Sequence, residues 1–213
     1  FLGEYDALRG QGHGCAHHMQ TPAMIGAAMA LRGVLESSDQ PFEIHVIGTP
    51  SEESLDGGKN EMAAHGGFDH IDVAFMVHGS TLTQLETPSL ALIEMDVEFH
   101  GKTAHAGIAP YAGRSAVDAV TMLQTGLGLM RNHLKDSSRV SNIVLAGGTA
   151  VNSVPDFAKV KVEIRHSSMA YLESVEQWTR EIAQAAAMAT QTQVQITPVA
   201  HIYNTTINDA MGA

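Results

Sequence analysis

The pattern of hydrophobic and polar positions divides the chain into two parts. In the first part, apolar residues form short unbroken runs at 44–49 and 73–77, which predict buried strands. A helical pattern covers 21–35, with Thr21 as the N-cap and Pro22 at the first helical position. Unbroken apolar strands that alternate with helices are typical of a parallel sheet covered on both faces. The first part is therefore predicted to be an α/β domain.

The second part begins near Thr87-Pro88 and shows strict alternation instead. Ile93, Met95 and Val97 alternate with acidic residues, which predicts a half-buried antiparallel strand. The elements that follow are a helix over 114–134, strands over 140–146 and 158–165, a helix over 169–188 and a strand around 194–196. This β-α-β-β-α-β order is the ferredoxin-like split motif. We therefore expect three segments, at 1–88, 89–203 and 204–213.

Composition and charge exclude several classes of protein. Of the 213 residues, 44% are hydrophobic, so a packed core is expected and disorder is not. No apolar run approaches the roughly 20 residues that span a bilayer. The net charge of −11 argues against a nucleic-acid partner, because no basic surface would neutralise phosphates. The single cysteine rules out an internal disulfide and favours a reduced compartment, so a cytoplasmic location is expected.

Two clusters of chemically active residues stand out in the first part. Cys15 and His17 lie two residues apart in a glycine-rich loop, and thiolate and imidazole at this spacing suit zinc. Glu52 and Glu53 follow the predicted strand 44–49, at the end of a parallel strand where ligands gather. One of these carboxylates can bind metal while the other activates water. Twelve histidines in the chain are a further reason to expect a metal site.

A third cluster is His78, which closes the apolar run 73–77. Each cluster also has a plain structural explanation. The first is equally a loop with surface histidines and one buried thiol, and an adjacent glutamate pair is more often a solvated acidic loop. A lone histidine at a strand end is more often a satisfied core residue. Three such clusters in one α/β unit are much less expected by chance, and together they favour a metal site.

Five short motifs make the sequence recognisable. They are, in order, Glu4-Tyr5-Asp6-Ala7-Leu8, Gly12-His13-x-Cys15-x-His17, Gly48-Thr49-Pro50-x-Glu52-Glu53, Gly57-Gly58-Lys59 and Val77-His78. Together they resemble the aminoacylase and carboxypeptidase G family of dinuclear zinc peptidases, in the branch of the aminobenzoyl-glutamate hydrolases and aminoacylase-like dipeptidases. The resemblance implies a zinc-peptidase-type catalytic α/β domain, incomplete in this chain, with an inserted ferredoxin-like lid and dimerisation domain.

The resemblance also implies roles for residues of the first part. The family's ligands for two divalent ions, Zn²⁺ or alternatively Mn²⁺, are matched by Cys15, His17, Glu53 and His78. Glu52 matches the general base, which accepts a proton from the attacking water and passes it to the leaving amine. Asp6 matches a residue that orients a ligand. His13 is expected to shape the loop rather than to bind metal.

In the second part, the resemblance assigns three lid residues. His105, within Gly101–Ala106, would stabilise the oxyanion of the tetrahedral intermediate in the active site of a partner subunit. Arg165, assisted by Asn152 from the partner, would hold the free carboxylate of the substrate. Without the family, Arg165 is an ordinary exposed strand residue and His105 a solvated turn histidine. A homodimer through the lid, acting on a small amide or dipeptide, is thus expected.

The sequence departs from the family pattern in several places. Ala16 stands where the family usually has Gly, and His18 where it has Asn or Asp. The family's last metal-binding histidine is expected beyond Ala213, and the early strands of the catalytic sheet are also expected outside this chain. The chain is therefore expected to be a fragment that is inactive by itself.

Three functional hypotheses follow. The first is metal-dependent hydrolysis of an N-acyl amino acid or dipeptide-like amide with a free carboxylate. The second is a homologue that binds metal and dimerises without catalysis, against which the presence of Glu52 and every matched ligand counts. The third is a cysteine hydrolase with Cys15 as the nucleophile, which a chelator would leave active.

Overall fold

The computed structural model describes residues 1–54, 57–85 and 88–212 and divides the chain into two compact units, 1–84 and 85–213. Thr87, at the expected segment boundary Thr87-Pro88, lies outside the described residues. None of the helices in the described ranges has a stretch long and apolar enough to cross a bilayer.

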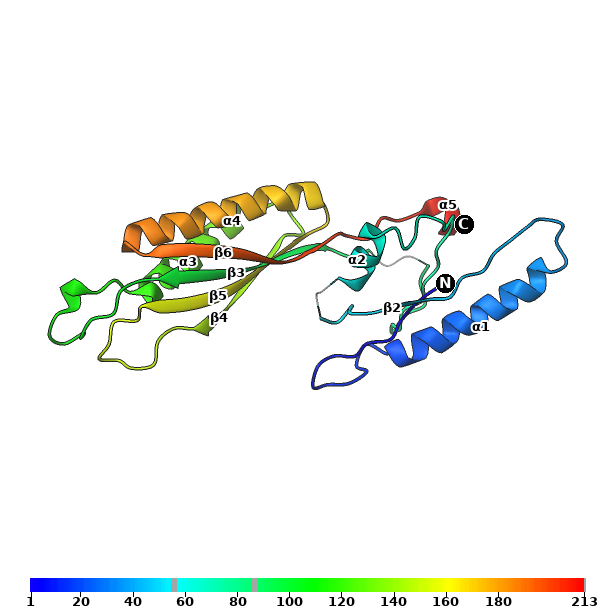
Figure 1. The fold of residues 1–213 in the computed structure, drawn as a ribbon. Helices are drawn as coiled ribbons and strands as arrows, with labels where there is room; N and C mark the ends of the chain where they lie inside the picture. Colours follow the sequence, from blue (N-terminus) through cyan, green and yellow to red (C-terminus); the bar gives the residue numbers. More distant parts are fainter. Residues whose placement is uncertain (55–56, 86–87, 213) are drawn as a thin grey trace. The chain divides into compact units, whose positions relative to one another are not determined.

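The first unit contains a small parallel sheet and two helices (Figure 1). Its elements are β1 (Leu2–Glu4), α1 (His17–Leu35), β2 (Ile47–Thr49) and α2 (Gly58–Ala64). β1 pairs with β2 in parallel, and the register places Glu4 beside Thr49 at the carboxyl end of both strands. The parallel pairing agrees with the prediction, and it brings the loops after Glu4 and after Thr49 to the same edge.

Two expectations about the first unit are wrong at the level of local structure. Helix α1 begins at His17, so Thr21 is not its N-cap and Pro22 lies inside the helix. Ala16 precedes the helix in a left-handed conformation, and the Thr21 hydroxyl instead donates a hydrogen bond to the Glu4 carbonyl over 2.9 Å. Thr21 therefore contacts β1 instead of capping the helix as the sequence predicted.

The run 73–77 is not a buried strand. It has no regular secondary structure, and Val73, Phe75 and Val77 are each about half exposed. Within the described part of the chain, one backbone hydrogen bond, from Leu2 N to Phe75 O over 2.9 Å, joins this segment to β1. The apolar run is thus placed beside the sheet without completing a ladder, which requires hydrogen bonds along the whole strand.

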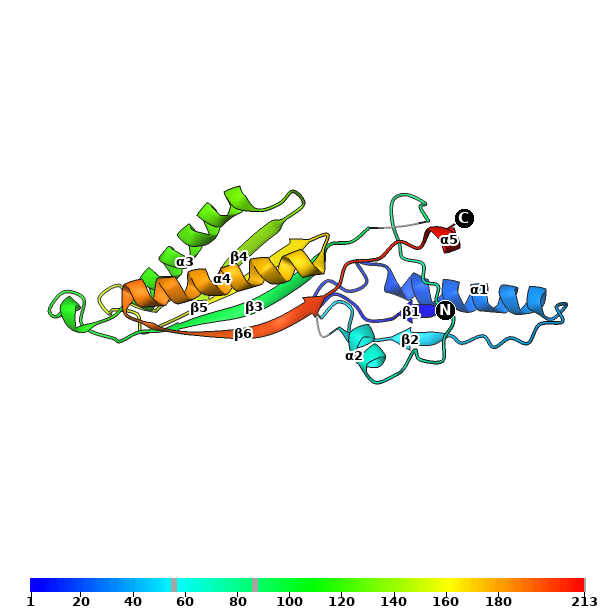
Figure 2. The same cartoon turned by 90° about the horizontal axis from the view of Figure 1, so that it is seen from above.

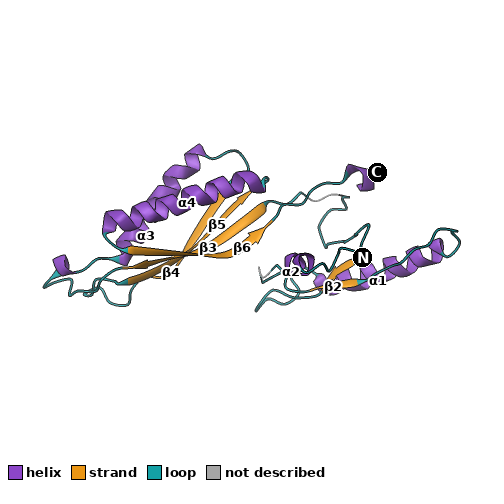
Figure 3. Cartoon of the chain, turned by 45° about the horizontal axis from the view of Figure 1, so that its top comes forward, coloured by secondary structure: helices purple, strands orange, loops and turns teal. Residues whose placement is uncertain are grey.

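The second unit is a four-stranded antiparallel sheet covered on one face by two helices (Figures 1 and 3). Its elements are β3 (Ala91–His100), η1 (Pro110–Ala112), α3 (Ala116–Met130), η2 (Arg131–His133), β4 (Arg139–Ala146), β5 (Phe157–His166), α4 (Met169–Thr190), β6 (Gln193–Ile202) and α5 (Asp209–Gly212). The strand order is β4-β5-β3-β6. This confirms the predicted ferredoxin-like β-α-β-β-α-β arrangement.

Alternation along β3 and β5 explains why the sheet has one apolar face. Met95, Phe99 and Val160 are fully buried in the core beneath α3 and α4, which lie side by side over the sheet (Figure 2). On the other face, Lys159 pairs with Asp96 over 2.7 Å and Lys161 pairs with Glu94 over 2.7 Å. Glu94 is buried and Asp96 only partly exposed, so the polar positions of β3 are more buried than simple alternation predicts.

Candidate metal centre

The carboxyl edge of the β1–β2 pair gathers four acidic residues of the first unit, Glu4, Asp6, Glu52 and Glu53. Glu4 ends β1, and the loop after Thr49 carries Glu52 and Glu53 to the same edge. The Glu53 backbone N–H donates to the Asp6 carboxylate over 2.8 Å, which ties the two loops together. Burial alone would raise the pKa of Asp6, but the hydrogen bonds from Glu53 and His17 lower it below its ordinary value. Asp6 is therefore held as a carboxylate between the two loops.

His17 occupies the centre of this edge. It opens α1, and its side chain is only 1% exposed. Its Nδ1 lies 3.1 Å from both the carbonyl oxygen and a carboxylate oxygen of Asp6. An Nδ1–H bond to these acceptors leaves the Nε2 lone pair free, which is the arrangement that metal-bound histidines use. Asp6 thus lies where a residue that orients a ligand is expected.

Three carboxylates face His17 Nε2. Glu4 Oε2 lies 3.1 Å away, Glu52 Oε2 3.7 Å and Glu53 Oε1 3.9 Å. Among the described residues, the buried atoms Glu4 Oε2, His17 Nε2 and Glu53 Oε1 have no hydrogen-bond partner, because the short contacts between them lack hydrogen-bond geometry. Buried lone pairs that converge without donors are costly unless a cation neutralises them. The donor set therefore fits a divalent metal ion.

His78 and Cys15 complete the expected ligands. The ring of His78 stands edge-on to that of His17, with centroids 5.5 Å apart, and its Nδ1 lies 2.9 Å from the Gly79 carbonyl. Atoms of Glu4, His17 and His78 all lie within 4.8 Å of one another, as do those of His17, Glu52 and Glu53. The structure thus places Glu53 and His78 each beside His17, although His78 is exposed and neither group includes Cys15.

Cys15 is a poor nucleophile in this setting. A hydrogen bond from its thiol to Glu53 raises its pKa to about 11, and burial and the charges of Glu53, Glu52 and Glu4 act in the same direction. Reactive cysteines have lowered pKa values beside cationic groups, so these surroundings disfavour the cysteine-hydrolase hypothesis. They suit a thiol that loses its proton when a metal ion binds.

Glu52 is the most accessible of the acidic residues here, with a side chain 42% exposed. Burial raises its pKa, as do the negative charges of Glu4 and Glu53, while Lys59 and His17 partly offset this effect. A carboxylate with a raised pKa accepts a proton more readily, as a general base must.

Sequence reasoning gave no role to Glu4 or Lys59. Glu4 is buried, and one of its carboxylate oxygens forms an ion pair with Lys59 of α2. Both residues lie in the motifs that made the sequence recognisable. Strand β1 would have placed Glu4 at its carboxyl end, but β1 has only three residues, too few to show the alternating pattern that predicts a strand.

The second unit separates its three expected site residues. His105 and Asn152 lie in neighbouring loops at one end, where Ala106 N donates to Asn152 O over 2.9 Å and His105 bridges to Ser153. Arg165 lies towards the other end of β5, about 26 Å along the strand from Phe157 at roughly 3.3 Å per residue. It binds both carboxylate oxygens of Glu163, over 2.7 and 3.0 Å. Within one copy of the second unit, Arg165 and Asn152 do not meet.

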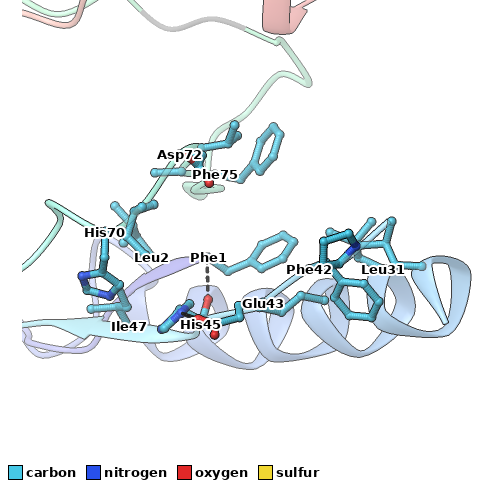
Figure 4. A pocket seen from close by; sticks show the side chains of 16 residues that line it. Phe1, Leu2, Leu31, Phe42, Glu43, His45, Ile47, His70, Asp72 and Phe75 are labelled. Carbon is cyan, nitrogen blue, oxygen red and sulfur yellow. Dashed lines mark hydrogen bonds and ion pairs between the residues drawn. The ribbon is translucent and has the colours of Figure 1, made fainter. Parts of the chain in front are cut away.

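A hollow of about 530 Å³ occupies another part of the first unit (Figure 4). Phe1, Leu31, Phe42 and Phe75 supply much of its apolar wall, and the rings of His45 and His70 lie 5.0 Å apart at its edge. Its lining includes none of the predicted ligands, so the hollow and the metal centre are separate places in the unit.

Comparisons with known proteins place the chain in a family. The peptidase dimerisation domain of the M20 peptidases matches residues 91–191. An Xaa-Arg dipeptidase of Mus musculus is 36% identical over 205 residues, which cover 95% of this chain and 47% of the relative. A p-aminobenzoyl-glutamate hydrolase polypeptide of Escherichia coli (strain K12) is 34% identical over 213 residues, covering 91% of this chain and 44% of the relative. The chain belongs to the M20 peptidase family.

The fold agrees with that of a solved M20-type structure. The aminobenzoyl-glutamate utilization protein of Klebsiella pneumoniae is 27% identical and aligns with a TM-score of 0.76, over 100% of this chain and 53% of that protein. The chain spans about half the length of the curated M20 relatives it matches. The expected family and the expected dimerisation domain are thus confirmed.

Proposed function

We propose that this M20 chain is part of a metal-dependent amidohydrolase that cleaves the amide bond of N-acyl amino acids or dipeptide-like substrates with a free carboxylate. The observation that carries this proposal is the convergence of buried, unpartnered Glu4, His17 and Glu53 atoms beside the accessible Glu52, all within the described residues. The relatives point to the same class of substrate, because their names describe a dipeptidase and a hydrolase of p-aminobenzoyl-glutamate.

In this proposal, two divalent ions, Zn²⁺ or Mn²⁺, are held by Cys15, His17, Glu53 and His78. Bound ions of this kind polarise the scissile carbonyl and lower the pKa of water. Glu52 accepts a proton from the attacking water and delivers it to the departing amine nitrogen. Burial and the nearby charges of Glu4 and Glu53 raise its pKa, which makes its carboxylate a better proton acceptor in the first transfer.

The lid residues act across a homodimer. His105 and Asn152 lie at the end of the second unit away from Arg165, so one copy cannot bring the three to a single substrate. Two copies can: Arg165 binds the substrate carboxylate, while His105 of the second copy donates to the developing oxyanion. On substrate binding, Arg165 exchanges some of its hydrogen bonds with Glu163 for the substrate carboxylate.

The edge of the lid sheet offers the surface for this dimer. β4 is an edge strand, and Ile143, Val144 and Leu145 on it are exposed. Met122 and Leu129 of α3 are exposed as well. An unpaired strand edge beside apolar side chains pairs readily with a second copy of itself.

The test uses the purified full-length protein to which this chain belongs and a panel of N-acyl amino acids, aminobenzoyl-glutamate and basic dipeptides. We expect release of free amino acid that a chelator abolishes and Zn²⁺ or Mn²⁺ restores. Glu52→Gln should lower kcat at least about 1,000-fold while bound metal, measured by elemental analysis, stays the same. Turnover that survives chelation would contradict the proposal, and bound metal without turnover on any substrate would support the non-catalytic homologue.

A further inference from the structure

The roles predicted for the neighbouring residues do not explain why the Glu4 carboxylate is buried among them. Its side chain is only 3% exposed, at the end of β1 and beneath the loops that carry the predicted ligands. One carboxylate oxygen, Oε1, pairs with Lys59. The other, Oε2, lies 3.1 Å from His17 Nε2 and has no hydrogen-bond partner among the described residues.

The negative charges around His17 are not fully balanced by positive charges. Glu4, Glu52 and Glu53 all approach His17, whereas Lys59 is the one cation that forms an ion pair with any of them in the described residues. A carboxylate oxygen and an imidazole nitrogen, each at least nine-tenths buried, therefore direct lone pairs at the same space. Removing such groups from water is costly unless a positive charge lies between them.

We propose that Glu4 is a further metal ligand, which binds through Oε2 beside His17 and His78 while Lys59 holds the other oxygen in place. Ligand atoms of Glu4, His17 and His78 lie within 4.8 Å of one another, as donors to one ion must. The inference deepens the proposed function and rests on it, because that function supplies the metal ion.

The proposal has a consequence for the choice of metal. Carboxylate oxygens suit harder cations such as Mn²⁺, whereas thiolate and imidazole suit Zn²⁺. A carboxylate added to Cys15, His17, Glu53 and His78 shifts the donor set towards Mn²⁺. Loss of the Glu4 charge should therefore weaken Mn²⁺ binding more than Zn²⁺ binding.

The experiment is calorimetric titration of the metal-free full-length protein with Mn²⁺ and Zn²⁺, together with the visible absorption spectrum of the Co²⁺ form. Glu4→Gln should lower the affinity for Mn²⁺ at least about tenfold, with a smaller loss for Zn²⁺, and should change the Co²⁺ spectrum. Lys59→Met keeps the Glu4 carboxylate but no longer holds its other oxygen, so it should retain the metal preference and lose less Mn²⁺ affinity than Glu4→Gln. Glu61→Gln, on exposed α2, is the matched control and should leave every reading unchanged.

If Glu4 merely neutralises Lys59, Glu4→Gln leaves the Mn²⁺ and Zn²⁺ affinities in their original ratio, and this result would overturn the inference. Should Glu4→Gln fail to fold, Glu4→Asp undergoes the same titrations. It keeps the charge but withdraws the oxygen by one methylene, so metal affinity falls under the inference and is retained under the alternative.

The two proposals fail in distinguishable ways. A wild-type protein that binds neither ion refutes the proposed function and the inference together. A wild-type protein that binds metal and loses it on substitution of His17, but not of Glu4, refutes the inference alone.

Discussion

Ala16 ends the loop that carries Cys15, and its backbone lies in the left-handed region at φ 64° and ψ 24°. Most side chains avoid this region, whereas glycine adopts it freely. The departure from the family's usual glycine therefore has a physical cost at a residue next to two predicted ligands. Ser51, with φ 57°, places the same kind of strain immediately before Glu52. Strained backbone of this kind is common at functional sites.

Replacing Ala16 with Gly should raise the free energy of unfolding by about 1 kcal/mol, since relief of the left-handed strain exceeds the added flexibility of the unfolded chain. The measurement is the urea midpoint of the metal-free protein. Ala30→Gly is the control, because Ala30 is exposed within α1 and its replacement should lower stability by about 0.5–1 kcal/mol. Destabilisation by both variants would show that the Ala16 backbone is not strained.

At the level of elements, the position of α2 supports the loop that carries Glu52 and Glu53. Gly58 is buried at the start of α2, and a Cβ built there would lie 2.0 Å from the Pro50 carbonyl oxygen. Only glycine allows this approach between the helix and the loop after β2. The same helix presents Lys59 to Glu4, so the placement of α2 affects both sides of the metal centre.

Gly58→Ala should therefore destabilise the protein by about 2–4 kcal/mol and weaken metal binding, because either the helix or the loop must move. Thermal unfolding and metal titration both report the change. Gly33→Ala is the matched control, since a Cβ at Gly33 of α1 meets nothing within 4 Å and should be neutral or mildly stabilising. Equal behaviour of the two variants would contradict the packing argument.

For the whole molecule, the separation of His105 from Arg165 along the lid makes the proposed activity depend on two copies. Mixing full-length Glu52→Gln protein with full-length His105→Ala protein tests this dependence directly. In a mixed dimer, one site combines an intact Glu52 with an intact His105 from the other copy, while the second site has neither.

Each variant alone should be inactive, and a mixture exchanged at equal concentrations should recover about a quarter of the wild-type activity, because half of the dimers are mixed and half of their sites work. Release of free amino acid measures the recovery. His105 is exposed in a loop, so its replacement should leave the fold intact. No recovery, with mixed dimers demonstrated by differently tagged copies, would show that His105 acts within its own chain or not at all.

The second unit shows how much of a fold the sequence can determine. Alternation along 93–99 and 158–165 predicted β3 and β5 because the strand period alone decides which side chains face the helices. The loop after β2 and the Cys15 loop were recognisable for a similar reason, since their ligand spacing is local. By contrast, the run 73–77 was wrongly predicted as a strand. An apolar run by itself does not show which secondary structure forms, because that depends on the segments packed against it.

The sequence by itself thus determined the α/β and ferredoxin-like parts, the family motifs and the local residues of the proposed metal centre, because each depends on short periods and spacings. Tertiary structure alone decided that Glu4 faces His17, that Lys59 balances one of its oxygens and that Arg165 lies far from Asn152. The reason is physical. Glu4 and Lys59 are 55 residues apart in the chain, and their meeting depends on how the parallel strands and α2 pack, which no local pattern records.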